Sequence, residues 1–244
     1  MNFWDRIVHA FESNLEHATL IKRYKRFLAD VKLPNGQEIT IHCPNTGSMR
    51  NCQDPGGKIW FSTVNKKTRK YAQTWQFIEV NDCELVGINT SLANRLVLEA
   101  IENGVIKQIV NFSKLRTEVS YGTENSRIDI LLEDGDTRCY IEVKNVSFGV
   151  PRRIGLFPDA VTVRGQKHLR ELINVKKAGD RAILVFCVQH TGVDRISPAD
   201  NIDPVYADLL RKALEAGVEV IAYQADIDIS SSTIRLEKEL PVIA

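Results

Sequence analysis

Three charged residues lie inside two short hydrophobic segments of this 244-residue chain. Asp129 interrupts an apolar segment at residues 128–132, and Glu142 and Lys144 alternate with apolar residues at 139–144. A buried carboxylate without a partner costs several kcal/mol. We therefore expect these groups to be held either for a metal ion or for one another.

The residues between the two segments predict a β-hairpin. Residues 133–136, Glu-Asp-Gly-Asp, are turn formers. A four-residue loop there pairs Asp129 with Tyr140 and puts Asp129 on the same face as Glu142 and Lys144. The two acids are then diagonal neighbours about 7 Å apart at Cα. The opposite face is expected to be apolar, with Ile128, Ile130, Ile141 and Val143. A register slip of one residue would separate the acids.

Two carboxylates on adjacent strands are typical ligands for a hard cation. Mg²⁺ takes carboxylate and carbonyl oxygens and keeps several waters, so Asp129, Glu142 and the Val143 carbonyl predict a Mg²⁺ site that Mn²⁺ could also fill. Lys144 could then position or deprotonate a water, or stabilise charge on a phosphate. This set suits phosphodiester hydrolysis. The alternative is an ordinary salt bridge of Asp129 with Arg127 or Lys144 at a sheet edge.

The element before the hairpin is a predicted helix that could supply a third acid. A polar cap at residues 90–91 begins it, and Gly104 follows its end. At 100° per residue, Glu99 lies at the border of the apolar stripe and could face the sheet. Glu99 could equally be a surface residue. Glu118, on a predicted strand at residues 116–120, is the competing acid.

A second predicted helix, residues 165–178, follows the hairpin. Arg164, Lys167 and His168 lie at its N-terminal end, where free backbone N–H groups and the helix dipole favour an anion. We therefore predict phosphate contacts there. Two alternatives stay open: Asp159 could pair with Arg164 to fix the loop, and His168 could be a structural group or a general base.

The remaining pattern predicts an α/β domain with a mixed sheet. A strand at residues 181–188, a helix at 204–216 and a strand at 218–223 alternate along the chain. The polar residues Asp226, Asp228 and Ser230–Ser232 are interpreted as parts of turns and loops.

The N-terminal part is basic although the whole chain has a net charge of only +1. Residues 18–80 hold eleven Lys and Arg against four acids, a difference of +7. Turn residues punctuate this strand-rich part, as in a small Greek-key barrel. Its aromatic residues are Tyr24, Phe27, Trp60, Phe61, Tyr71 and Trp75. Such rings can stack on bases while basic residues follow phosphates, but each ring could instead belong to the core.

The cysteine pattern argues against a disulfide-bonded or zinc-binding protein, and the hydropathy argues against a membrane or secreted protein. Five cysteines without a CxxC pair, at positions 43, 52, 83, 139 and 187, favour inert thiols over disulfides or zinc. No apolar run approaches the ~18 residues of a membrane span, and Asp5 and Arg6 stand where a signal peptide would be apolar. We expect a cytoplasmic protein with no membrane partner.

Several of these segments resemble known families. A helix acid, a strand Asp and an ExK triplet in this order look like the PD-(D/E)xK nuclease core, and in that resemblance Glu99 matches the helix acid. Residues 20–31, 43–49 and 157–169 (Phe-Pro-Asp-Ala-Val-Thr-Val-Arg-Gly-Gln-Lys-His-Leu) are similar to segments of the sugar fermentation stimulation protein A family. The resemblance implies an N-terminal OB-fold, a nuclease-like α/β domain, sequence-independent DNA binding and a role in regulating sugar (maltose) utilisation.

We accordingly predict two domains, an OB-fold-like basic domain over residues 1–86 and a nuclease-like domain over 87–244. The predicted metal ligands are Asp129 and Glu142, and the predicted catalytic set adds Glu99 and Lys144. The predicted DNA contacts are basic groups from both domains: Lys22, Arg23, Lys25, Arg26, Lys66, Lys67, Arg69, Arg164, Lys167 and His168. Two functions remain open, a DNA-binding protein with a nuclease-like metal site and an active Mg²⁺-dependent nuclease.

Overall fold

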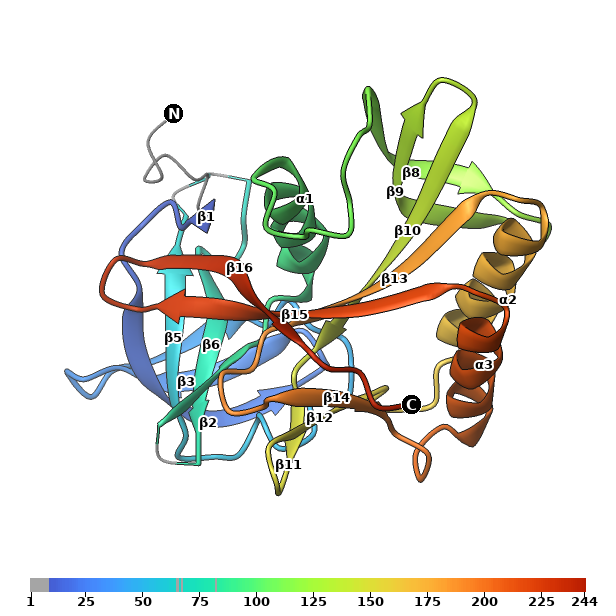
Figure 1. Cartoon of the computed structure of the whole chain (residues 1–244). Coiled ribbons are helices and arrows are strands. Elements are labelled where there is room, and N and C mark those ends of the chain that lie inside the picture. Colours follow the sequence, from blue (N-terminus) through green and yellow to red (C-terminus); the bar gives the residue numbers. More distant parts are fainter. Residues whose placement is uncertain (1–8, 65, 67, 82) are drawn as a thin grey trace.

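The protein, described from a computed structural model for residues 9–64, 66, 68–81 and 83–244, has a β-barrel beside an α/β domain (Figure 1). The barrel strands are β2 (Glu16–Tyr24), β3 (Leu28–Lys32), β4 (Glu38–His42), β5 (Lys58–Thr63), β6 (Gln73–Val80) and β7 (Glu84–Gly87). They follow the order β4-β3-β2-β5-β6-β7, and a pairing of β4 with β6 closes the barrel. This is the predicted OB-fold. Trp75 and Phe61 are buried in its core.

The α/β domain is built on a seven-stranded mixed sheet. Its order is β1-β16-β15-β13-β10-β9-β8, from β1 (His9–Ala10), β8 (Lys114–Tyr121), β9 (Ser126–Asp134), β10 (Thr137–Val146), β13 (Arg181–Val188), β15 (Glu219–Asp228) and β16 (Thr233–Leu240). A small sheet holds β11 (Phe148–Val150), β12 (Ile154–Phe157) and β14 (Arg195–Pro198). The sequence prediction missed β1 and β16 and ended β15 too early.

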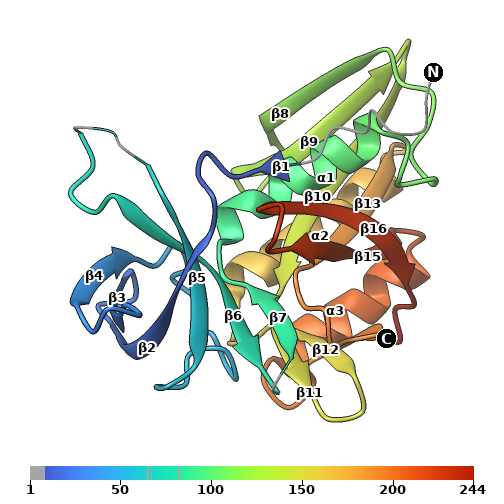
Figure 2. The same cartoon turned by 90° about the vertical axis from the view of Figure 1, so that its left-hand side faces the viewer.

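Helices cover both faces of the large sheet. A 3₁₀ turn, Thr90–Leu92, leads into α1 (Ala93–Glu102) on one face, and α2 (Val163–Lys177) and α3 (Pro204–Glu215) cover the other. Alternation along β13 explains this: Ile183 and Val185 pack with α1, whereas Leu184 and Phe186 pack with α2 and α3. Figure 2, turned by 90°, shows the barrel beside this three-layered domain.

The barrel and the α/β domain share one apolar core on the α1 side. Trp60 and Phe77, from barrel strands, belong to the same buried cluster as Leu96 and Val97 of α1. The chain crosses between the two domains twice, because β1 lies at the edge of the large sheet, paired with β16, before the barrel begins. The N-terminal strand therefore belongs to the sheet of the α/β domain.

Candidate metal and phosphate site

The hairpin that carries the charged residues forms with a shorter turn than predicted. Thr137 pairs with Asp134 and Tyr140 with Leu131, so the loop is the two residues Gly135 and Asp136. Gly135 has a φ of +57°, which suits a tight hairpin turn. The predicted pairing of Asp129 with Tyr140 is wrong by two residues. A shift of two preserves the alternation of faces.

The two strands separate just where the acids lie. The last β9 and β10 pair is Ile130 with Ile141, and beyond it Val143 N–H donates to Asp129 Oδ2 at 2.7 Å. The packing of β9 also changes at this separation. Ile128 packs on the α2 side of the sheet, whereas Ile130 packs on the α1 side. The prediction that all four apolar hairpin residues share one face fails at Ile128.

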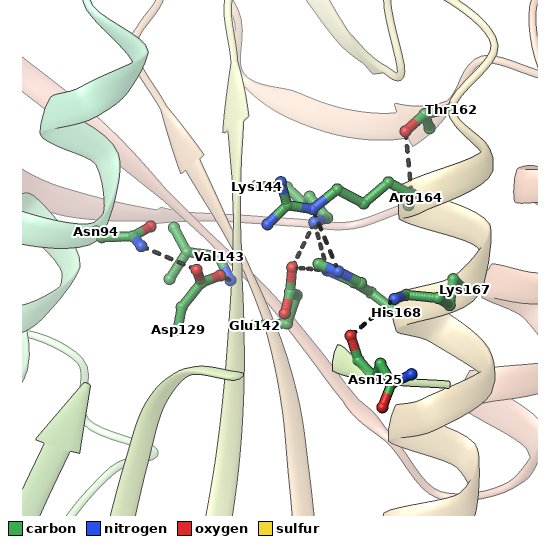
Figure 3. A network of polar contacts seen from close by, with 11 residues as sticks. Asn94, Asn125, Asp129, Glu142, Val143, Lys144, Thr162, Arg164, Lys167 and His168 are labelled. Atoms are coloured by element: carbon green, nitrogen blue, oxygen red, sulfur yellow. Dashed lines mark hydrogen bonds and ion pairs between the residues drawn. The ribbon is translucent and has the colours of Figure 1, made fainter. Parts of the chain in front are cut away.

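Asp129 is held by α1 through an amide that the sequence prediction missed. Asn94 Nδ2 donates to Asp129 Oδ1 at 2.9 Å (Figure 3). Burial raises the pKa of the Asp129 carboxyl, and the negative charge of Glu142 raises it further. The hydrogen bond from Val143 N–H lowers this pKa, but by less than the other two effects raise it. The charged form of Asp129 is therefore disfavoured at this position, and a nearby cation would stabilise it.

Glu142 lies at the centre of a polar cluster between the sheet and α2. Lys144 Nζ donates to Glu142 Oε1 at 2.5 Å, and His168 Nδ1 contacts the same oxygen. Lys144 Nζ lies 3.2 Å from His168 Nδ1, and Arg164 Nε donates to His168 Nε2 at 3.4 Å. Burial works to raise the pKa of the Glu142 carboxyl, but Lys144 and His168 hold it below its ordinary value.

These contacts do not include the salt bridge of Asp129 that was the alternative to a metal site. In the described part of the chain, Asp129 forms no ion pair with Arg127 or Lys144, and Lys144 pairs with Glu142 instead. Glu142 is 1% exposed, and its Oε2 has no hydrogen-bond partner among the described residues. An orphaned buried carboxylate oxygen beside a second carboxylate fits a divalent cation.

The donor set nevertheless holds few protein ligands. Within the ranges that the structure describes, no group of three or more His, Cys, Asp and Glu side chains is arranged to hold a metal ion. Asp129 and Glu142 would supply two carboxylates, and Mg²⁺ commonly completes such a set with waters.

The structure does not bring Glu99 to this site. Its Oε1 accepts from Arg95 Nε at 2.8 Å, and Glu99 lines a small cavity together with Arg235 and Leu236 of β16. Glu99 is five residues beyond Asn94, about 7.5 Å along the helix axis, and is therefore over the wrong part of the sheet. The competing acid, Glu118, is exposed on β8. The amphipathic pattern predicted the rotation of the helix but not its axial position.

The predicted phosphate contacts of α2 divide into two groups. Arg164 is exposed beside His168, at the helix start that Thr162 caps through Gly165 N–H. Lys167 instead donates to the backbone oxygens of Glu124 and Asn125 in the β8–β9 turn, so its ammonium is engaged within the protein.

The predicted contacts in the barrel also divide. Lys25 and Arg26 are exposed at the turn between β2 and β3, next to Phe27, which is 47% exposed. Lys22 is exposed, and its Nζ lies 3.5 Å from Asp30 Oδ2. Lys66 and Arg69 are exposed on the loop before β6. Lys67 lies outside the described residues.

Arg23 differs from its exposed neighbours because its guanidinium holds a barrel loop together. It donates to the backbone oxygens of Asn45 and Gly47 at 2.8 and 3.0 Å, and to Gln53 Oε1 at 3.2 Å. Arg23 is thus a structural residue of the barrel.

The same barrel loop is tied to the segment before α2. Ser48 Oγ and Met49 N–H donate to Asp159 Oδ2 at 2.8 and 3.0 Å. One alternative predicted that Asp159 pairs with Arg164. The structure instead pairs Asp159 with Ser48 and Met49. Residues 43–49 and 157–169, which are far apart in the sequence, are thus joined by the hydrogen bonds of Ser48 and Met49 to Asp159.

The fold and the site define the class of this protein: an OB-fold barrel joined to an α/β domain with a mixed sheet and an acid, acid, lysine cluster on adjacent strands. Family models support this division, with the SfsA N-terminal OB domain matching residues 21–88 and the Sugar fermentation stimulation protein RE domain matching residues 91–231. The chain belongs to the sugar fermentation stimulation protein family.

Individual relatives match over almost their full length. A sugar fermentation stimulation protein homolog of Shewanella denitrificans is 56% identical over 229 residues, covering 92% of this chain and 96% of the relative. The homolog of Teredinibacter turnerae is 53% identical over 233 residues, covering 96% and 99%. A solved structure, Pyrococcus furiosus SfsA in complex with Ca²⁺, is similar with a TM-score of 0.86 at 26% identity, covering 98% of this chain and all of that one.

Membrane insertion by a helix finds no support in the part of the chain that the structure describes: none of its helices is long and apolar enough to span a bilayer.

Proposed function

We propose that this protein binds DNA with little sequence preference and carries a divalent-metal site at Asp129 and Glu142. The observation that carries the proposal is the meeting of Asp129, Glu142 and Lys144 where β9 and β10 separate, with Arg164 and His168 beside them. Through DNA binding the protein would act on the use of sugars such as maltose. The Ca²⁺ complex of the Pyrococcus furiosus relative supports a divalent cation as a ligand.

The exposed basic residues of the barrel support the DNA-binding part. Lys25 and Arg26 directly precede the exposed Phe27 at one turn, a combination that can contact phosphates and stack on a base. Lys66 and Arg69 add charge on another loop. Sequence-independent binding of this kind depends strongly on salt.

Active cleavage of phosphodiester bonds is the second candidate, and Lys144 favours it. The Lys144 side chain is 14% exposed and contacts both Glu142 and His168. A bound Mg²⁺ would supply Lewis-acid activation and charge neutralisation at a phosphate. Lys144 Nζ would hold or move a proton beside that phosphate, while Asn94 and Val143 N–H keep Asp129 oriented.

One set of measurements separates the two functions. DNA affinity is measured in EDTA by fluorescence anisotropy, and cleavage of single-stranded, duplex, branched and RNA substrates is measured with Mg²⁺ or Mn²⁺. The binding function requires DNA affinity that falls with salt, and release at the same low salt as a neutral control protein would refute it. The nuclease function requires cleavage that Lys144→Ala abolishes while binding in EDTA stays nearly intact.

A further inference from the structure

A cavity of about 230 Å³ lies where the barrel meets the end of the site strand β10. Asn45 and Thr46 of the barrel form one wall, and Asn145 and Ser147 form another. The volume is below the range of about 300–1,000 Å³ of drug-sized ligand pockets. The cavity therefore suits one small ring.

Each wall of this cavity continues an element of the metal and phosphate site. Asn145 directly follows Lys144 on β10. Thr90 begins the turn leading into α1, whose Asn94 holds Asp129, and Asp159 precedes α2, which carries Arg164. A ligand chain bound at the site could therefore extend into the cavity.

The barrel loop, residues 44–49, is fixed over the cavity at both ends. Thr90 Oγ1 donates to Pro44 O at 3.1 Å, and Ser48 Oγ donates to Asp159 Oδ2 at 2.8 Å. Arg23 holds the middle of the loop through two carbonyls. The wall from the barrel is consequently preorganised, which reduces the entropy cost of binding.

The chemistry of the lining favours a neutral ring over a phosphate. Asp159 is the one charged residue among the described residues that line the cavity, and its Oδ2 already accepts two hydrogen bonds. Within the described chain, Asn45 and Asn145 have no protein partner for their Nδ2 groups, although the oxygen of each amide accepts a bond. Phe148 and Phe157 add apolar surface.

We propose that this cavity receives one unpaired nucleobase of a nucleic-acid strand whose neighbouring phosphate lies at the metal site. The inference rests on the proposed function and narrows its substrate class to strands with an unstacked nucleotide. The amide donors would bind acceptor atoms on the edge of the base, and the phenyl rings would contact its faces. Stacking of a base on an aromatic side chain contributes about 1–3 kcal/mol.

The test compares two fluorescein-labelled oligonucleotides of twelve units, one of thymidines and one of abasic spacers, in EDTA. The two oligonucleotides carry the same phosphates. The Kd of the abasic oligonucleotide divided by the Kd of the thymidine oligonucleotide therefore measures the contribution of the bases. Thr46→Met narrows the cavity from its exposed rim and should lower this ratio about tenfold. Thr137→Met, at the distant hairpin turn, is the matched control and should leave it unchanged.

The outcomes distinguish the inference from the proposed function. If both oligonucleotides bind and Thr46→Met keeps the ratio of the unmodified protein, the base cavity is refuted and DNA binding stands. If neither oligonucleotide binds the unmodified protein, both fail. Calorimetric binding of maltose that Thr46→Met removes would also overturn the inference, because the cavity would then be a sugar site.

Discussion

Replacement of Asp159 by alanine should destabilise the contact between the two domains by about 3 kcal/mol. Asp159 Oδ2 accepts from Ser48 Oγ at 2.8 Å and from Met49 N–H at 3.0 Å. Hydrogen bonds to a charged group contribute about 1.5–3 kcal/mol each, and the low end applies because Asp159 is half-buried. Two such bonds give the value of about 3 kcal/mol.

Urea unfolding measures this change. Tryptophan fluorescence reports on the barrel through the buried Trp75, and circular dichroism reports on the helices, which in the described chain all lie outside the barrel. With a slope of about 3 kcal/mol per molar urea, the midpoint of Asp159→Ala should fall by about 1 M. Asp136→Ala, in the exposed hairpin turn, should shift it little.

A double-mutant cycle decides whether the contact is the cause. Ser48→Ala alone should cost about 1.5 kcal/mol, and adding it to Asp159→Ala should cost clearly less, because the Ser48 hydroxyl then keeps only its 2.9 Å contact with the carbonyl oxygen of residue 159. Strictly additive losses would refute the reasoning, as would an Asp159→Ala midpoint equal to that of Asp136→Ala.

Three further predictions concern the metal, the basic residues and the thiols. Mg²⁺ should raise the Tm of the unmodified protein in a thermal-shift assay, and Asp129→Asn or Glu142→Gln should abolish that rise; a rise retained in both would contradict the assignment of ligands. Lys22→Met should reduce the salt slope of DNA binding without a loss of stability, whereas Arg23→Met should cost about 2 kcal/mol in urea unfolding because backbone hydrogen bonds are lost; equal effects would argue against separate roles. Ellman's reagent at pH 8 should label Cys83, which is exposed, but not the buried cysteines before unfolding; burial raises the pKa of Cys52 to about 12, so a thiolate at Cys52 in the native protein would contradict the buried geometry.

Local patterns predicted the hairpin and the helices because each depends on neighbouring residues. The strand predicted at residues 181–188 matches β13, and helix 204–216 differs from α3 by one residue. The hairpin formed although its turn was two residues shorter than predicted, but the alternation of faces did not continue to the acids: Asp129 contacts Asn94 of α1, whereas Glu142 contacts His168 of α2. Of the five cysteines expected to be buried or inert, Cys43, Cys52 and Cys187 are buried, Cys139 is partly buried and Cys83 is exposed.

Contacts between distant segments could not be predicted in the same way. Asn94 replaced Glu99 beside Asp129 because helical periodicity fixes a rotation and leaves the axial position to tertiary packing. Arg23 and Lys167 looked like phosphate ligands, yet each binds backbone oxygens that only the folded turns present. The number of basic residues in a segment therefore overestimates its free positive charge.

The two crossings of the chain limit how the barrel can move. A domain joined by a single linker can take almost any orientation, whereas one joined at two points can turn only about the line between them. Here the joints are residues 11–15, after the strand that pairs with β16, and residues 88–92, before α1. Any opening of the loop at 44–49 away from Asp159 would follow that single axis, and it would have to part the apolar core that Trp60 and Phe77 share with α1.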